Sequence, residues 1–179
     1  DLLVCRSPLM EGVCYILPSE VLEDALALAT AQLNGSVRVE RSCPPQERTA
    51  VGDPDWIRRV LLNLIRNACE AMPQGGILQA AVRYEPEHVV FTIRDSGPGI
   101  PEEDIDKVFL PFWGKREGGT GMGLSIVHSL VERHGGSVEL ANHPEGGLQA
   151  TVRLPWSVPC KAQKGNGGTS KLGRSAENT

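Results

Sequence analysis

VLLNLIRNACEAM, residues 60–72, is the most informative stretch of this chain. Its apolar side chains recur at helical spacing and form one stripe: Leu61, Leu64, Ile65 and Ala68. Asn63 and Asn67 are four positions apart, so both amides lie on one face of the predicted helix. The pair has two explanations: hydrogen-bonded core residues, or ligand-binding residues. Ligand binding is favoured, because an amide oxygen suits Mg²⁺, which usually binds together with substrate phosphates and few protein ligands.

The flanking sequence predicts one mixed domain. Asp53 and Pro54 are typical of an N-cap and a first helical residue, so the helix is expected to run from there to Met72. Two further helices are predicted at 19–34 and 121–134, and a short one at 102–108. Strands are predicted at 36–42, 48–52, 77–84, 89–95, 138–141 and 149–154. Strands and helices do not alternate strictly, which indicates an α+β fold with one mixed sheet and helices on one face.

A second motif, DSGPG, follows the predicted strand 89–95 and begins at Asp95. A carboxylate at a strand end, followed by two glycines, suggests that the backbone approaches a ligand closely. A buried carboxylate accepts a hydrogen bond from an exocyclic amine such as that of adenine, and leaving it unpaired is costly. The same residue types are common in surface turns, which is the favoured explanation for this motif taken alone.

A third motif, GGTGMGL at 118–124, leads into the predicted helix 121–134. A glycine-rich loop that enters a helix N-terminus presents free N–H groups to anions. It is not a P-loop, because no Gly-Lys-Ser/Thr closes it, and it lacks the preceding strand of a dinucleotide fingerprint. By itself the loop is a weak indication of phosphate binding.

In this order, the three motifs resemble the nucleotide site of the family that joins gyrase, Hsp90-type chaperones, histidine kinases and mismatch-repair ATPases. VFLPFW at 108–113 resembles the phenylalanine box of histidine kinases, and LSIV at 124–127 and ERHGG at 132–136 are also similar to that branch. The resemblance covers about residues 17–155. It implies a Bergerat-type ATP-binding fold. This is a two-layer α/β sandwich with a mixed, mostly antiparallel sheet of about five strands and three main helices on one face.

The resemblance also implies roles for single residues, with ATP and Mg²⁺ as the bound groups. Asn67 would hold Mg²⁺, and Asn63 would lie beside the phosphates. Asp95 would bind the adenine amine. The base pocket would be shaped by Gly97, Gly99 and Ile100. The loop residues assigned to ATP are Gly119, Thr120, Gly121, Met122, Gly123 and Leu124.

Residues 110–120 would form a mobile lid. Lys115 and Arg116 would reach the γ-phosphate from it, although solvated lid charges explain them equally well.

Asn63 distinguishes phosphoryl transfer from hydrolysis. In hydrolytic relatives a Glu stands four residues before the metal-binding Asn and activates water. An amide has no basic site near neutral pH and cannot act as a general base. The implied function is therefore a protein histidine kinase catalytic domain. Two alternatives of the same fold are an anti-sigma-type serine kinase and a non-catalytic ATP-binding module.

The phosphate acceptor is expected outside this chain, on a dimerisation hairpin of the same kinase. That acceptor typically reads His followed by Glu or Asp, which none of the four histidines does: His88, His128, His134 and His143. Residues 1–16 are expected to be a remnant of that hairpin and its linker, 17–156 the ATP-binding domain, and 157–179 a flexible tail or linker. The expected partners are the hairpin and a downstream response regulator. The chain alone is expected to be monomeric and not to phosphorylate itself.

Composition excludes several other classes. The formal net charge is −4, so no basic excess indicates nucleic-acid binding. No run of 18 apolar residues occurs, so no membrane contact is expected of this fragment. Five cysteines without close pairing argue against a disulfide framework or a zinc site, and Cys69 fits a small core residue. These features favour a cytoplasmic domain, whether or not the full-length protein carries a membrane anchor.

Overall fold

The computed structural model describes residues 14–31, 37–113 and 121–156 of the chain. Helices and strands follow in the order β1 (Cys14–Ile16), α1 (Pro18–Thr30), β2 (Val37–Ser42), β3 (Ala50–Gly52), α2 (Pro54–Glu70), β4 (Gly76–Tyr84), β5 (His88–Asp95), η1 (Glu102–Lys107), α3 (Gly123–Arg133), β6 (Ser137–Asn142) and β7 (Leu148–Pro155). Here η1 is a 3₁₀ helix. None of the helices within the described ranges combines the length and apolarity of a membrane span.

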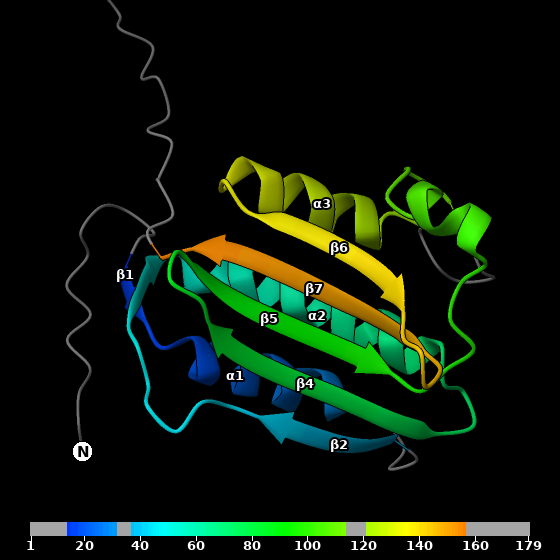
Figure 1. The fold of residues 1–179 in the computed structure, drawn as a ribbon, viewed down its shortest axis with the longest axis horizontal. Helices are drawn as coiled ribbons and strands as arrows, with labels where there is room; N and C mark the ends of the chain where they lie inside the picture. Colours follow the sequence, from blue (N-terminus) through cyan, green and yellow to red (C-terminus); the bar gives the residue numbers. More distant parts are fainter. Residues whose placement is uncertain (1–13, 32–36, 114–120, 157–179) are drawn as a thin grey trace, which may run out of the picture.

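The main sheet has five strands in the order β2-β4-β5-β7-β6. Only β2 and β4 are parallel, and the other neighbours are antiparallel. Helices α1 and α2 cross one face of this sheet, and α3 packs against α2 and β6 (Figure 1). The predicted two-layer sandwich with a mostly antiparallel sheet is therefore confirmed.

The core lies between the sheet and the helices. Strand side chains alternate between the two faces of a sheet, and the inward-facing positions of the three central strands are buried and apolar. They are Leu78, Ala80, Val82, Val89, Phe91, Ile93, Ala150, Val152 and Leu154. The α2 stripe covers them with Val60, Leu61, Leu64 and Ile65, each at most 3% exposed. This packing fixes the rotation of α2 about its axis and hence the direction of its two asparagines.

Among the α-helices of the described residues, α2 begins at a side-chain cap, and the other two do not. The Asp53 side chain accepts a hydrogen bond from the Asp55 N–H at 2.8 Å, which confirms the predicted N-cap of α2. Helix α2 ends at Glu70, two residues before its predicted end, and α3 begins at Gly123, two residues after its predicted start. Helix α1 starts at Pro18, one residue early, and residues 32–34 of its predicted range lie outside the described residues.

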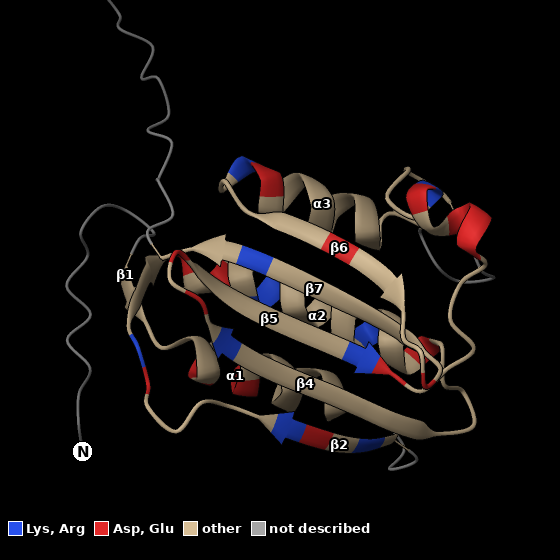
Figure 2. Ribbon diagram, in the orientation of Figure 1, with Lys and Arg blue, Asp and Glu red and all other residues tan. Residues whose placement is uncertain are grey.

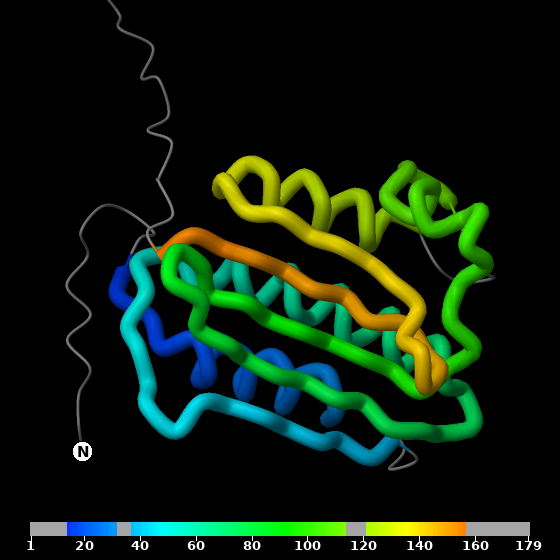
Figure 3. The backbone as a smooth tube through the Cα atoms, viewed as in Figure 1, coloured from blue at the N-terminus to red at the C-terminus, as the bar shows by residue number. Residues whose placement is uncertain are grey.

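In the small second sheet, of β1 and β3, the strand β3 falls within the predicted range 48–52, whereas β1 is not predicted. A strand of three residues is too short to show a period of two. The end of β7 is tied to this sheet, because the Val51 N–H donates to the Trp156 carbonyl oxygen at 2.8 Å. The two described ends of the chain, at Cys14 and Trp156, consequently lie at the same end of the molecule (Figure 3).

Charges are mixed over the surface. Figure 2 shows basic and acidic residues interspersed along β2 and across the open face of the sheet. Several of them pair, as in Arg153–Glu139 at 2.9 Å and Arg94–Glu145 at 3.3 Å. The arrangement agrees with the scattered charge pattern of the sequence.

Candidate functional site

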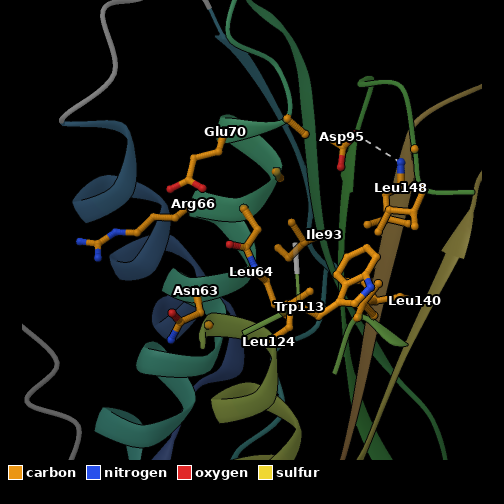
Figure 4. A pocket seen from close by; sticks show the side chains of 18 of the residues that line it. Asn63, Leu64, Arg66, Glu70, Ile93, Asp95, Trp113, Leu124, Leu140 and Leu148 are labelled. Carbon is orange, nitrogen blue, oxygen red and sulfur yellow. Dashed lines mark hydrogen bonds between the residues drawn. The ribbon is translucent and has the colours of Figure 1, made fainter. Parts of the chain in front are cut away.

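A cavity of about 560 Å³ lies between α2 and the sheet, near the end of β5 (Figure 4). Its wall also includes the loop after β5, residues 108 and 113, and the start of α3. The volume falls within the range of about 300–1,000 Å³ that is usual for small-molecule sites. The three motifs, which are distant in sequence, thus border one space.

Helix α2 supplies the two amides. Asn63 and Asn67 both line the cavity and are partly exposed, as the four-residue spacing predicts. The Asn63 Nδ2 donates to the Arg59 carbonyl oxygen at 2.9 Å. That bond turns the NH₂ group toward the helix backbone, so the amide oxygen remains available to a ligand.

The start of α3 faces these amides. A Cβ atom placed on Gly123 would lie 3.5 Å from Asn63 Oδ1 and 3.7 Å from Asn67 Oδ1. Gly123 and Leu124 line the cavity, and Met122 is the N-cap residue of α3. The first N–H groups of a helix have no partner within it and carry partial positive charge. This end of the cavity therefore combines N–H donors with amide oxygens, which suits a phosphate chain and a hard cation.

Asp95 lies at the C-terminal end of β5 and is only 4% exposed. Its Oδ1 accepts hydrogen bonds from the N–H groups of Gly97, at 2.8 Å, and Leu148, at 3.2 Å. Figure 4 shows the second of these bonds and the carboxylate beside the cavity. Within the described part of the chain, Oδ2 accepts no hydrogen bond. A buried carboxylate with one oxygen fixed and the other free is suited to accept from an amine of a ligand.

The loop after β5 is held from the β6–β7 hairpin. Asn142, at the end of β6, accepts from the Ile100 N–H at 2.9 Å and donates to the Ile100 carbonyl oxygen at 2.6 Å. Gly99 has φ +73°, and a Cβ atom there would collide with the Asn142 side chain. Gly147 has φ +87° and packs against the Asp95 backbone so closely that no Cβ would fit. Glycine is required at both positions, because the neighbouring atoms leave no space for a Cβ atom.

The predicted site residues fall into three groups. Those that line the cavity are Asn63, Asn67, Asp95, Gly99, Ile100, Gly121, Gly123 and Leu124. Gly97 and Met122 do not line it: the first supports Asp95 and the second caps α3. Lys115, Arg116, Gly119 and Thr120 lie outside the described residues.

Other residues of the site carry no signal of their own in the sequence. Asn142 and Leu148 contact the site from a hairpin more than forty residues further along the chain, so only the tertiary structure brings them there. Trp113 lines the cavity, although the sequence indicates it only as part of the phenylalanine box.

Cys69, on α2 near Asp95, is a core residue as predicted, at 8% exposed. Burial raises the pKa of its thiol, and the negative charges of Asp95 and Glu70 raise it further. The group is therefore a neutral thiol at physiological pH and a poor nucleophile.

Comparison with known proteins gives a consistent result. The family model described as "Histidine kinase-, DNA gyrase B-, and HSP90-like ATPase" matches residues 52–158. Sporulation kinase A of Bacillus subtilis is 30% identical over 157 residues, which cover 87% of this chain and 26% of the relative. The sensory histidine kinase/phosphatase NtrB of Klebsiella oxytoca is 36% identical over 147 residues, covering 76% of this chain and 42% of the relative. The chain thus spans less than half the length of either protein.

Comparison with solved structures also identifies histidine kinases. The catalytic domain of histidine kinase ThkA superposes with a TM-score of 0.75 at 26% identity, covering 81% of this chain and 96% of that domain. The family model includes all three motifs and more than half of the chain. The chain therefore belongs to the family of histidine kinase-, DNA gyrase B- and HSP90-like ATPases, as an ATPase domain of the histidine kinase branch.

Proposed function

We propose that this domain binds Mg-ATP in the cavity and transfers the γ-phosphate to a histidine on a dimerisation hairpin outside these residues. The observation that carries the proposal is the convergence of Asn63, Asn67, Asp95 and the start of α3 on one cavity. One end of this cavity offers a buried carboxylate, and the other offers amide oxygens and helix N–H groups. An adenine nucleotide has complementary groups, with an amine on its base at one end and phosphates at the other.

At the base end, Asp95 accepts a hydrogen bond from the adenine amine through Oδ2. Its other oxygen is held by two backbone N–H groups, so the acceptor is already oriented. Ile100 and Gly99 form the neighbouring wall, and the Gly97 N–H donates a hydrogen bond to the carboxylate.

At the phosphate end, Asn67 would hold Mg²⁺ through its amide oxygen, and Asn63 would lie beside the phosphates. The bound cation would neutralise charge that develops on the transferred phosphoryl group. The α3 N-terminus, with Gly121, Gly123 and Leu124, donates N–H groups to the phosphate oxygens. Lys115 and Arg116 belong to the same proposal as lid residues, and Gly119, Thr120 and Met122 belong to it as residues of the phosphate-binding loop.

Transfer is favoured over hydrolysis at this site. Asn63 occupies the cavity wall where an activating carboxylate would stand in a hydrolase, and its amide cannot remove a proton from water. Catalysis then consists of positioning the γ-phosphate for an imidazole nucleophile brought by a partner.

The implied partners are the hairpin and a response regulator that takes the phosphate onward. The relatives named above are a sporulation kinase and a sensory histidine kinase, which supports this role over that of an anti-sigma-type serine kinase. A non-catalytic nucleotide-binding module is the remaining alternative, and the experiment below separates it.

The test supplies a dimerisation hairpin in trans, with γ-labelled ATP and Mg²⁺. We expect the isolated chain to bind ATP without labelling itself, and the hairpin to acquire an acid-labile phosphohistidine. A hairpin whose acceptor His is replaced by Ala is the matched control and should stay unlabelled. Acid-stable label on a partner serine would instead favour the anti-sigma-type kinase, and ATP binding without transfer would favour the non-catalytic module.

A further inference from the structure

We propose that Trp113 is the stacking platform for the nucleotide base in this cavity. The inference rests on the proposed function, because it specifies how the same site holds adenine. Trp113 lines the cavity and is partly buried against the hydrophobic core. Its position in the chain directly follows Phe112 and immediately precedes residues 114–120.

The indole is the one aromatic surface among the described residues that line the cavity. Figure 4 shows it inside the cavity, among the side chains of Ile93, Leu124 and Leu140, which border the same space. The nearby Phe109 ring contacts His128 at a centroid distance of 5.0 Å, and Phe112 is 65% exposed. Neither of these two rings lines the cavity, so Trp113 alone offers a flat π surface to a ligand there.

The indole lies beside Ile93, which precedes Asp95 on β5 (Figure 4). Ile93 and Asp95 are two residues apart on the inward face of β5, which corresponds to about 7 Å along the strand. A base whose amine meets Asp95 extends its rings over Ile93. Since the indole lies in this part of the cavity, the rings and the indole come into contact.

The backbone holds the indole in place on both sides. The Trp113 N–H donates to the Leu110 carbonyl oxygen at 3.2 Å, and the Phe112 N–H donates to the Gly121 carbonyl oxygen at 2.8 Å. Phe112 has φ +67°, and Gly121, at φ +64°, packs against it with no room for a Cβ. These close backbone contacts fix the direction from which the Trp113 side chain enters the cavity.

The indole N–H is also available to a ligand. Trp113 Nε1 has no hydrogen bond among the described residues, and the only buried side-chain polar atom without a partner in those ranges is Trp56 Nε1. The Trp113 nitrogen is therefore accessible from the cavity or from solvent. A tryptophan with its ring on aliphatic side chains and its N–H accessible is suited to stack on a base and donate to a ribose oxygen.

An alternative role for Trp113 is to block the site until a nucleotide displaces the indole. This role predicts the opposite change in ATP affinity when the indole is removed. A platform strengthens ATP binding, so its removal weakens binding, whereas removal of a blocking group strengthens binding. The test uses the 179-residue chain with Trp113→Leu and Trp113→Phe, measuring the affinity for Mg-ATP and for inorganic tripolyphosphate by calorimetry. Leu retains apolar packing without the π face, and Phe retains the π face.

We expect Trp113→Leu to weaken ATP binding about tenfold and Trp113→Phe less than about threefold, as for loss and retention of base stacking. Tripolyphosphate affinity should stay unchanged in both variants, because tripolyphosphate has no base. Nucleotide should quench the tryptophan emission of the original chain, and this change should disappear in Trp113→Phe.

ATP affinity that is unchanged or higher in Trp113→Leu would overturn the role of Trp113. So would equal losses for ATP and tripolyphosphate, which would indicate a general disturbance of the site. Failure of the original chain to bind ATP would instead reject the proposed function itself.

Discussion

The two ends of the cavity are built differently. At the end proposed to hold the base (the base end), Asp95 and Ile100 are fixed by four hydrogen bonds between side chains and backbone, which involve Gly97, Leu148 and Asn142. At the phosphate end, Asn63 makes one hydrogen bond to its own helix, and the Asn67 side chain makes none within the described residues. The base end is therefore preorganised, whereas the polar groups of the phosphate end are left for a ligand to satisfy.

Under the proposed function, this difference predicts a separate role for each end. A preorganised pocket loses little conformational entropy on binding, so the base end contributes chiefly to affinity and selectivity. The asparagine amides at the other end are satisfied only when the phosphates and the cation are bound. They therefore contribute chiefly to stabilising the charge that changes during the transfer reaction. Variants at the phosphate end should thus affect transfer more than binding, and variants at the base end the reverse.

The largest effect is expected from Asn67→Ala. Loss of the amide oxygen removes a cation ligand, and metal stabilisation of transferred charge is worth several kcal/mol, so transfer to the hairpin should fall by about 100-fold or more. Nucleotide binding without Mg²⁺, measured by calorimetry in the presence of a chelator, should change little. Gln79→Ala, which removes an exposed amide on the open face, is the control and should transfer normally. Transfer retained in Asn67→Ala would remove this residue from the cation site.

Asp95→Asn should affect binding instead. The substitution replaces a charge-assisted acceptor worth roughly 1.5–3 kcal/mol, so ATP affinity should fall about tenfold or more. The N–H groups of Gly97 and Leu148 would also face an amide, which has fewer acceptor sites than a carboxylate. Calorimetry with ATP measures the loss, and tripolyphosphate affinity serves as the control for the phosphate end. Unchanged ATP affinity would exclude Asp95 from the base pocket.

Asn142→Ala should have the smallest effect of the three. It removes both hydrogen bonds to Ile100, but these lie at an exposed position where water replaces part of their contribution. We expect an ATP affinity about threefold lower, consistent with a net contribution of about 0.5–1.5 kcal/mol per bond that water partly offsets. Asn142→Asp keeps the acceptor for the Ile100 N–H and should lose less than Asn142→Ala. Equal affinities in all three proteins would mean that the loop holds its shape without Asn142.

The parts of the site that the sequence predicts are those with local signals. The face of α2 with Asn63 and Asn67 follows from helical periodicity, and Asp95 follows from its place between an apolar strand and a glycine pair. Asn142 and Leu148 could not be predicted, because their contacts depend on how β6 and β7 pair beside β5. Trp113 could not be predicted for a different reason. The sequence alone does not show which aromatic residue of the phenylalanine box, 108–113, faces the cavity.

The same distinction holds for the fold. Long, periodic elements such as α2, β4 and β5 are predicted nearly to their ends, because each has enough residues to show its period. The strand β1 is not, because three residues owe their conformation to β3 rather than to their own pattern. The residues 114–120 lie outside the described structure, so the predicted lid assignments there stay predictions.

The central position of β5 governs how backbone amide protons exchange around the base end. Strand β5 is paired on both edges, with β4 and with β7, whereas β2 and β6 form the edges of the sheet. Edge strands open through small local fluctuations, but a strand in the middle exchanges its protons only when much of the domain unfolds. Asp95 closes this protected strand, so its carboxylate is expected to stay in place through small openings, whereas Asn142 lies at the end of the edge strand β6 and its two bonds to Ile100 open more readily. Under the proposed function, an adenine base would therefore dissociate from a carboxylate that stays in place, without unfolding of β5.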